Sequence, residues 1–335
     1  MRRHLSKFAY ITLGFCGAMP VFYLYALHAR EEMRGAQQPS PEIQANRLPR
    51  PTRDELKKIQ STLAAELHNS QRILCWIMSM ESRSELRKAI MQTWGRKCQL
   101  VLFMMAGGKE GAPTRVEAIN TTRNAHNIYL SMAENYNFLW QKTKLAFRYV
   151  YERHRDAFDW IVKIDDDSFL IVENLRIFLQ KKTQTMPNFY GFQYKSMGGY
   201  NSGGPGYVLS NVNLGKFIQS LDMPGCSTAP HGAEDIEVAR CLKLVGISPA
   251  DTRDEKGRYH LSPFEPLHIM HAKKILPSQY RWFWGFTAHQ PQEEFECCSD
   301  EAFSFHYITP DNMRVMEYLI YYVSPFSGRD IWTLS

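Results

Sequence analysis

The chain has 335 residues, room for one large or two small domains, and its 44% hydrophobic and 13% aromatic content indicates a substantial folded core. This composition excludes a disordered scaffold. The formal net charge of +6 is modest for the length, and no long Lys/Arg block or RNA-binding fingerprint occurs, so we expect no nucleic-acid partner. The excess positive charge could instead help to hold an anionic phosphate compound.

The first residues indicate a membrane anchor. Three basic residues among the first seven precede an uncharged stretch over 8–27, about the length of a helix that crosses a bilayer. Basic residues before the span place the N-terminus in the cytoplasm, so we expect a cytoplasmic tail over 1–7 and a signal anchor over 8–27. A cleaved signal peptide is the alternative, although Ala-Leu-His-Ala at 26–29 is a poor cleavage site.

A polar, proline-containing segment follows the anchor. We expect a stem over 28–70 and then a folded domain over 71–335. Within the stem, Thr52 and Glu55 have the spacing of a capping box, and apolar residues follow at helical intervals up to Leu67. This helix could pack against its own domain or pair with a second subunit in a homodimer.

Seven cysteines are present, and six of them follow the expected anchor. An even number suits disulfides in an oxidising compartment, whereas no CxxC or HxxxH spacing supports zinc. Short separations favour Cys75 with Cys98 and Cys226 with Cys241, but six cysteines allow fifteen pairings, so the connectivity stays open. Asn120 begins a glycosylation acceptor, which has meaning only if this part of the chain is luminal.

Strands and helices are expected to alternate in the folded region. Apolar runs predict buried strands at 73–78 and 100–105, and a further strand begins at 160. One helical pattern follows the first strand and a polar turn and ends at 94, and a second covers 138–151. This alternation predicts an α/β domain with a mainly parallel sheet. Ligands of such a domain bind at the carboxyl ends of the strands.

Three consecutive carboxylates interrupt an apolar run at one of these strand ends. Like charges crowded into an apolar setting destabilise a fold unless a cation or hydrogen-bond donors compensate them. In an extended segment, Asp165 and Asp167 project to one face and Asp166 to the other. We therefore expect a site for Mg²⁺ or Mn²⁺ that substrate phosphates complete. A solvated acidic turn is the alternative.

Two further stretches could serve a ligand. Glycines over 198–206 allow the backbone to approach a ligand closely, although their spacing matches neither a phosphate loop nor a dinucleotide fingerprint. A helix is expected after Gly232, with Glu234 and Asp235 in its first turn. Helix capping explains both carboxylates, but one of them could also receive a proton from a substrate hydroxyl.

The C-terminal part adds aromatic residues and a histidine. The segment 280–286 contains Trp282 and Trp284, which could stack on a sugar ring or fill a core. His306 ends a short apolar run after the adjacent Cys297 and Cys298. A single histidine is usually structural, so this residue alone does not indicate a metal site.

Taken together and in order, these stretches resemble the β1,3-galactosyltransferase superfamily, and most closely its core 1 branch. The resemblance covers roughly 73–322. It is carried by the runs ILCWIM, TW, KIDDDSFLIVENLR, SGGPGYVLS, EDIEVARC and CCSDEAFSFHY. The usual family form of the glycine-rich run is GGAG, so Pro205 departs from it and leaves the geometry of that loop open.

The resemblance implies a GT-A type glycosyltransferase, with a Rossmann-like sheet flanked by helices, after a single N-terminal transmembrane helix. It implies inverting, Mn²⁺-dependent transfer of galactose from UDP-galactose to the 3-hydroxyl of GalNAc on Ser or Thr of glycoproteins. The protein would be a single-pass type II Golgi membrane protein with a luminal catalytic domain over 71–335. An inactive, chaperone-like paralogue and a β1,3-glycosyltransferase with another donor or acceptor are the alternatives.

The resemblance also implies roles for single residues. Asp165, Asp167 and His306 would hold the metal, with His268 as the alternative histidine, and Asp235 matches the catalytic base, with Glu234 as its rival. The expected cofactor-binding residues are Asp165, Asp166, Arg87 and Trp94. The expected substrate-binding residues are Trp282, Trp284, Tyr207, Gly204 and Tyr307.

Overall fold

The structure is a computed structural model that describes residues 62, 71–119, 124–275 and 281–323. Contacts group residues 61–335 into one compact unit. The expected anchor, the glycosylation acceptor at Asn120 and the stem, apart from Thr62, lie outside the described residues. Within the described ranges, no helix is long and apolar enough to cross a membrane.

The strands form where apolar and β-branched residues gather. The expected strand at 73–78 is confirmed, and the one expected at 100–105 runs one residue further. The described strands are β1 (Ile73–Met78), β2 (Leu100–Ala106), β3 (Arg115–Ala118), β4 (Ala125–Leu130), β5 (Trp160–Asp165), β6 (Phe169–Leu170), β7 (Asn188–Gly191), β8 (Gln193–Tyr194), β9 (Tyr200–Asn201), β10 (Tyr207–Ser210), β11 (Ser248–Ala250), β12 (Leu261–Ser262) and β13 (Ser304–Phe305).

The helices also follow the expected pattern, with shifted ends. The helix expected over 138–151 runs from 139 to 154, and the pattern up to 94 divides into a helix and a short 3-10 turn. The described α-helices are α4 (Ser84–Gln92), α5 (Leu139–His154), α6 (Val172–Gln180), α7 (Asn211–Ser220), α8 (Glu234–Leu244), α9 (Pro266–Met270), α10 (Ala272–Ile275), α11 (Arg281–Phe286) and α12 (Pro310–Tyr321).

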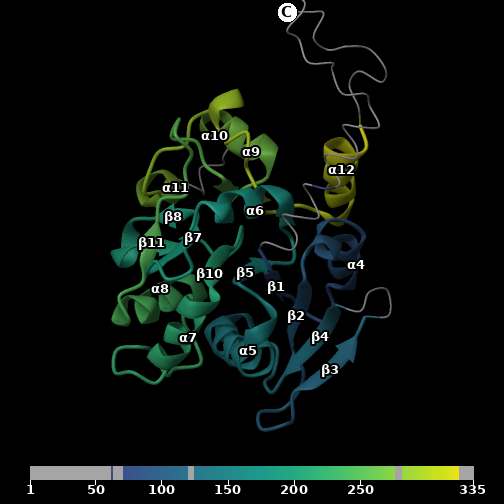
Figure 1. The fold of residues 1–335 in the computed structure, drawn as a ribbon, viewed down its shortest axis with the longest axis vertical. Coiled ribbons are helices and arrows are strands. Elements are labelled where there is room, and N and C mark those ends of the chain that lie inside the picture. Colours follow the sequence, from purple (N-terminus) through teal and green to yellow (C-terminus); the bar gives the residue numbers. More distant parts are fainter. Residues whose placement is uncertain (1–61, 63–70, 120–123, 276–280, 324–335) are drawn as a thin grey trace, which may run out of the picture. The chain divides into compact units, whose positions relative to one another are not determined.

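Eight strands form the central sheet, in the order β11, β7, β10, β5, β1, β2, β4, β3 (Figure 1). Only the pairs that involve β10 or β3 are antiparallel, so the expected mainly parallel sheet is confirmed. Met78 at the end of β1 pairs with Asp165 at the end of β5. The carboxyl ends of these central strands therefore meet at the edge where such sheets bind ligands.

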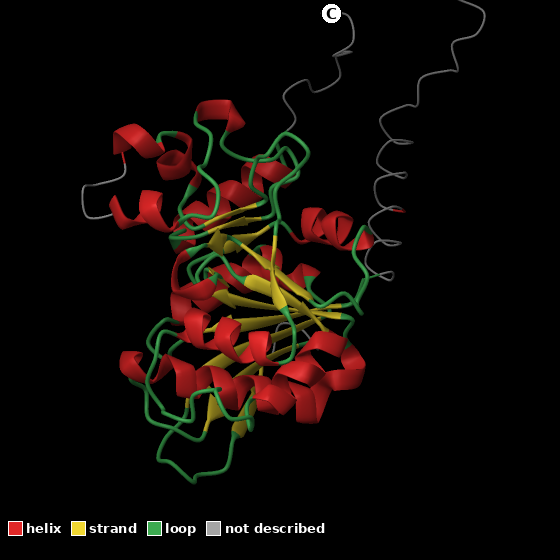
Figure 2. Ribbon diagram, turned by 90° about the vertical axis from the view of Figure 1, so that its left-hand side faces the viewer, coloured by secondary structure: helices red, strands yellow, loops and turns green. Residues whose placement is uncertain are grey.

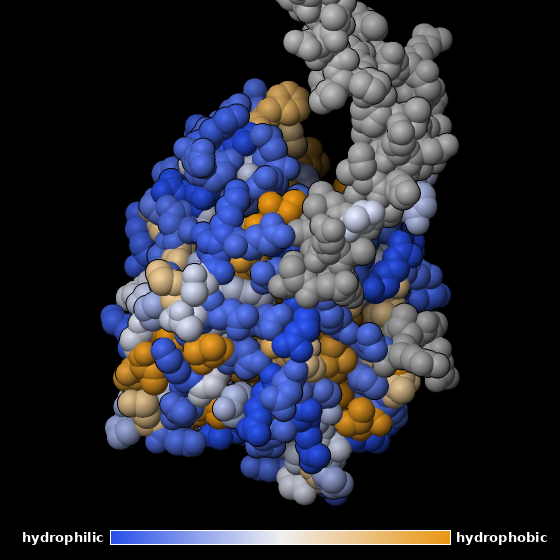
Figure 3. All heavy atoms as spheres, viewed as in Figure 1, coloured by the Kyte–Doolittle hydropathy of each residue, from blue (hydrophilic) through white to orange (hydrophobic). Residues whose placement is uncertain are grey.

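Helices lie above and below the strands (Figure 2). Trp76 of β1 stacks on Phe147 of α5 at 5.4 Å between ring centroids, and Phe147 meets Phe217 of α7 edge-on at 5.2 Å. These buried aromatic contacts fix α5 and α7 against the sheet. The outer face seen in Figure 3 is mostly hydrophilic, with apolar side chains in small groups.

Disulfides add covalent links within this unit. Cys75 bonds to Cys98 and Cys226 to Cys241, which confirms the two pairs that short separation favoured. The adjacent Cys297 and Cys298 form a third pair. All six cysteines after the expected anchor are therefore paired, which suits an oxidising compartment.

Candidate active site

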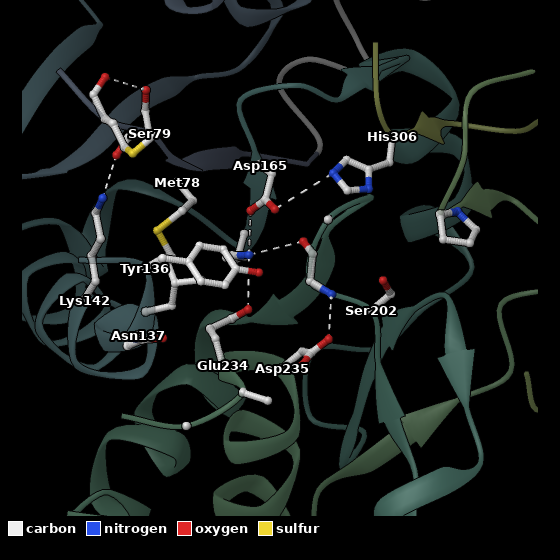
Figure 4. Close-up of a pocket in the computed structure, with 18 of the residues that line it drawn as sticks. Met78, Ser79, Tyr136, Asn137, Lys142, Asp165, Ser202, Glu234, Asp235 and His306 are labelled. Carbon is white, nitrogen blue, oxygen red and sulfur yellow. Dashed lines mark hydrogen bonds and ion pairs between the residues drawn. The ribbon is translucent and has the colours of Figure 1, made fainter. Parts of the chain in front are cut away.

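A cavity of about 750 Å³ opens at the carboxyl ends of β1 and β5. Figure 4 shows Asp165, Glu234, Asp235 and His306 around one space, with Ser79 and Lys142 on the left-hand side. The charged and histidine side chains that line the cavity are Arg83, Glu134, Lys142, Lys163, Asp165, His231, Glu234, Asp235 and His306. The cavity thus brings together residues that lie far apart in the chain, from Met78 to Tyr307.

The acidic residues after β5 turn their side chains in two directions. Asp166 is fully buried, where it accepts a hydrogen bond from Ser79 Oγ at 2.7 Å and pairs with Arg83 at 2.8 Å. Burial raises the pKa of Asp166 to about 7, although Ser79 and Arg83 oppose the rise. Asp166 therefore braces the turn, while Asp165 and Asp167 face the other way, as the strand alternation predicted.

Asp165, Asp167 and His306 form the possible metal group. One ligand atom from each lies within 4.8 Å of the others, and His306 Nε2 is 3.0 Å from Asp167 Oδ1 and 4.0 Å from Asp165 Oδ2. Although burial would raise the pKa of Asp167, His306 and Arg83 lower it to about 2, so this carboxylate is charged. Two carboxylates and one imidazole are donors that suit Mn²⁺.

Strand pairing places His306 beside the acidic turn. Phe305 of β13 pairs with Phe169 of β6, and the Ile308 amide donates to the carbonyl of Asp167 at 2.7 Å. A Cβ atom on Gly204 would overlap the His306 imidazole, so glycine is required there. The alternative histidine, His268, is not in this group.

His268 lies on α9, where its Nδ1 is 2.6 Å from a Glu265 oxygen.

Pro205, the departure from the family pattern, keeps its loop anchored because its carbonyl accepts a hydrogen bond from Ser304 Oγ. The glycine-rich loop is thus joined to β13, the strand that precedes His306.

The first turn of α8 holds two carboxylates in different surroundings. Glu234 accepts a hydrogen bond from the Tyr207 hydroxyl at 2.6 Å and one from Lys163 Nζ at 3.2 Å, so both of its oxygens are engaged. Within the described part of the chain, Asp235 accepts hydrogen bonds from backbone amides, those of Ile236 at 2.9 Å and Gly203 at 3.4 Å. Burial and the neighbouring Glu234 raise the pKa of Asp235 to about 6.

The structure separates the remaining predicted residues into two sets. Gly204, Trp282 and Tyr307 line the cavity, and Trp282 and Tyr307 are 41% and 51% exposed. Tyr207 is buried beneath the cavity, and Trp284, packed against the core, is not among the lining residues. In this arrangement Tyr207 contacts Glu234 rather than the open space.

Two residues expected to bind the cofactor, Trp94 and Arg87, make hydrogen bonds to the loops beside the cavity. Trp94 is fully buried and donates from Nε1 to the Ser168 carbonyl at 3.1 Å. Arg87 donates to Ser79 Oγ at 3.2 Å and to the carbonyls of Met80 and Glu81. Neither residue lines the cavity.

Three cations at the cavity were missed by sequence reasoning. Arg83 pairs with Asp166 and Asp167, Lys142 with Glu134, and Lys163 with Asp165. Lys142 and Lys163 are buried, each inside an apolar helix or strand pattern. A lysine within an apolar pattern could have indicated these site residues from the sequence, because a buried ammonium requires a carboxylate or another hydrogen-bond acceptor as its partner.

Comparisons with known proteins agree with this geometry. The family described as Galactosyltransferase matches residues 85–201. Glycoprotein-N-acetylgalactosamine 3-beta-galactosyltransferase 1 of Xenopus laevis is 32% identical over 266 residues, which are 78% of this chain and 70% of that protein. Chondroitin sulfate synthase 3 of Homo sapiens is 23% identical over 119 residues, 32% of this chain and 13% of that protein.

The long match and the central mixed sheet lead to one assignment. The match to the Xenopus protein extends over most of both chains, and the family match includes the acidic turn. The α/β architecture with its large sheet fits a GT-A-like glycosyltransferase. The chain therefore belongs to the β1,3-galactosyltransferase family and is a glycosyltransferase.

Proposed function

We propose that this protein is an inverting, Mn²⁺-dependent transferase that moves galactose from UDP-galactose to the 3-hydroxyl of GalNAc on Ser or Thr of glycoproteins, forming the core 1 glycan. The observation that carries the proposal is a single cavity lined by Asp165 and His306 of the Asp-Asp-His group and by a separate carboxylate, Asp235, with a raised pKa. The name of the Xenopus relative supports GalNAc-bearing glycoproteins as acceptors.

Asp235 is our candidate for the general base. Inversion requires one group to take the proton of the acceptor hydroxyl as its oxygen attacks the anomeric carbon. The carboxylate lines the cavity, and a pKa of about 6 leaves it mostly ionised at neutral pH but a stronger base than an ordinary aspartate. Glu234 is the weaker candidate because Tyr207 and Lys163 engage both of its oxygens.

Asp165, Asp167 and His306 would hold the metal. A bound Mn²⁺ would neutralise the charge that develops on the leaving diphosphate, so no general acid would be needed. Arg83 holds Asp167 through its second oxygen at 3.1 Å, which leaves the first oxygen directed toward His306. The chain thus orients the ligands before substrate enters.

Aromatic side chains at the cavity suit the acceptor sugar. Trp282 and Tyr307 line the space and are partly exposed, so a ring face can stack on GalNAc. Tyr307 follows His306 directly, and the two rings stack with centroids 3.9 Å apart. We place the acceptor between these aromatic residues and Asp235.

We further propose that the protein is a single-pass type II Golgi protein with its catalytic domain in the lumen. This topology rests on the uncharged stretch over 8–27, and the three cysteine pairs support an oxidising compartment. A homodimer formed through the stem is part of the same proposal. The molecular mass of the purified full-length protein in detergent distinguishes one chain from two.

The activity is tested with the full-length protein, UDP-galactose, Mn²⁺ and a GalNAc-Thr peptide, by measuring UDP release and the linkage of the product. We expect a β1,3-linked galactose that forms only with the metal. Folded protein that binds Mn²⁺ but transfers no galactose would contradict the proposal and favour a chaperone-like paralogue. Transfer of a different sugar, or to a different acceptor, would assign the same site to another β1,3-glycosyltransferase.

A further inference from the structure

Lys163 is a charged side chain buried within the central sheet. Its side chain is 2% exposed, and Nζ donates to Asp165 Oδ1 at 2.8 Å, Glu234 Oε2 at 3.2 Å and the Gly203 carbonyl at 3.2 Å. An ammonium has three donors, so every one of them has an acceptor here. Burial of this charge is tolerated because it is both paired and hydrogen-bonded.

The two carboxylates that share Lys163 belong to different parts of the site. Asp165 ends β5 and is one of the possible metal ligands, whereas Glu234 begins α8 next to Asp235. Glu234 lies 71 residues from Lys163 in the sequence. One ammonium therefore connects the metal group with the helix that carries the candidate base.

Two further residues, Tyr207 and Gly203, enclose the side chains of Lys163 and Glu234. Tyr207 lies opposite Lys163 in the register of β10 and β5 and donates to Glu234 Oε1. A Cβ atom on Gly203 would lie 2.6 Å from Glu234 Oε2 and 3.1 Å from Lys163 Nζ. The glycine-rich loop thus has a glycine where a side chain would separate the two charges.

We propose that Lys163 is a positioning residue that couples the metal ligands to the base-bearing helix, holding Asp165 through Oδ1 and the first turn of α8 through Glu234. With Oδ1 engaged, Asp165 presents Oδ2 toward His306. The inference rests on the proposed function and adds to it a link between metal binding and the orientation of Asp235. This link is the role of Lys163, since no other side chain in the described contacts bonds to both Asp165 and Glu234.

The coupling predicts the direction in which the affinity for Mn²⁺ changes when Glu234 loses its charge. The positive charge of Lys163 is compensated by two carboxylates, Asp165 and Glu234. When Glu234 is neutralised, Asp165 is the one charged partner that remains among these two. The surroundings of the metal ligands then become one charge more positive, within a poorly screened interior. A divalent cation should bind less tightly, although Glu234 is not a member of the metal group.

The test is a calorimetric titration of the full-length protein with Mn²⁺, without donor or acceptor. We expect Glu234→Gln to raise the Kd for Mn²⁺ about fivefold or more, the range typical of coupled sites. Glu237→Gln is the matched control, because Glu237 lies on the same helix and pairs with Arg240 at 2.6 Å. Its Kd should stay within about twofold of the wild-type value, since it makes no described contact with Lys163.

A double-mutant cycle sharpens the result. In a Lys163→Met background, Glu234→Gln should change the Kd for Mn²⁺ much less than in the wild type, because the connecting residue is gone. Lys163→Met leaves two carboxylates without their cation and can fail to fold, so the comparison of Glu234→Gln with Glu237→Gln decides by itself. Equal Kd values for Glu234→Gln and the wild type would overturn the inference.

Failure of the proposed function gives a different result. A wild-type protein that binds no Mn²⁺ would overturn the proposed metal site and this inference with it. A wild type that binds Mn²⁺, shows the Glu234→Gln shift and yet transfers no galactose would contradict only the proposed reaction. The same shift in Glu237→Gln would show a general effect of charge on α8 and overturn the specific role of Lys163.

Discussion

The acidic turn after β5 and the first turn of α8 both hold adjacent carboxylates and both reach one cavity, through Asp165 in the turn and through Glu234 and Asp235 in the helix. In the acidic turn, His306 and Arg83 lower the pKa of Asp167 to about 2, while burial raises that of Asp166 to about 7. In the helix, Glu234 is bound to a lysine and a tyrosine, while burial raises the pKa of Asp235 to about 6.

Carboxylates that are adjacent in the sequence therefore differ in pKa and in role, because their bonding partners differ. A carboxylate beside a cation or an imidazole keeps its charge and can ligate a metal, as Asp167 can. A carboxylate left with only backbone donors in a buried setting becomes a better base, as Asp235 does. If these roles are correct, substitution of Asp167 should weaken metal binding and substitution of Asp235 should lower the rate of transfer.

The largest effect is expected for Asp235→Asn. An amide cannot accept the acceptor proton, so kcat should fall by about 10²- to 10⁴-fold. Calorimetry should show Mn²⁺ binding close to that of the wild type, because Asp235 is outside the metal group and, unlike Glu234, makes no described hydrogen bond to Lys163. A variant that keeps kcat within about tenfold of the wild type would move the base elsewhere.

Asp167→Asn, in contrast to Asp235→Asn, should change the affinity for Mn²⁺. The loss of a charged ligand should weaken Mn²⁺ binding by at least about 100-fold, more than the typical cost of altering a residue behind the ligands. Asp156→Asn, an exposed residue before β5, is the control and should bind Mn²⁺ like the wild type. Unchanged Mn²⁺ affinity in Asp167→Asn would remove the acidic turn from the metal site.

Gly204→Ala should weaken Mn²⁺ binding by about 10-fold or more, a cost typical of displaced ligands. The new methyl group would overlap the His306 imidazole and push it away from the two aspartates. Gly285→Ala meets no atom within 4 Å and provides the control. If both alanine variants bind Mn²⁺ equally well, close packing of Gly204 on His306 has no part in the site.

The smallest expected effect is on the pH profile. Asp235 must be unprotonated to act, and its raised pKa means that protonation begins near pH 6 rather than near pH 4. The kcat/KM of the wild type should therefore fall about tenfold per pH unit below pH 6. A profile that stays flat down to pH 5, with Mn²⁺ still bound, would contradict an Asp235 base.

Local patterns were sufficient to predict much of the fold. Apolar runs located β1 and β2, and the alternation of strands and helices indicated a mainly parallel sheet with its ligand edge at Asp165. Strand geometry also separated Asp166 from its two neighbours. These features depend on residues close together in the chain, so the sequence contains the necessary information.

Features that depend on distant contacts were harder to predict. The structure brings His306 to the acidic turn through the pairing of β13 with β6, which no local pattern indicates. The choice between Glu234 and Asp235 depends on Tyr207 and Lys163, which lie on other strands. The family resemblance implied that Trp94 and Tyr207 contact a ligand, and in the structure both are buried and bonded to other residues of the site.

The role of Asp235 as the base of a galactosyltransferase is tested by the initial rate of galactose transfer to a GalNAc-Thr peptide by the wild type and Asp235→Asn at saturating Mn²⁺. We predict a β1,3-linked product from the wild type and a rate below about 1% of it from the variant, with equal Mn²⁺ binding. Equal rates for the two proteins would contradict the role of Asp235 as the base, and no product from wild-type protein that binds Mn²⁺ would contradict the proposed galactose transfer.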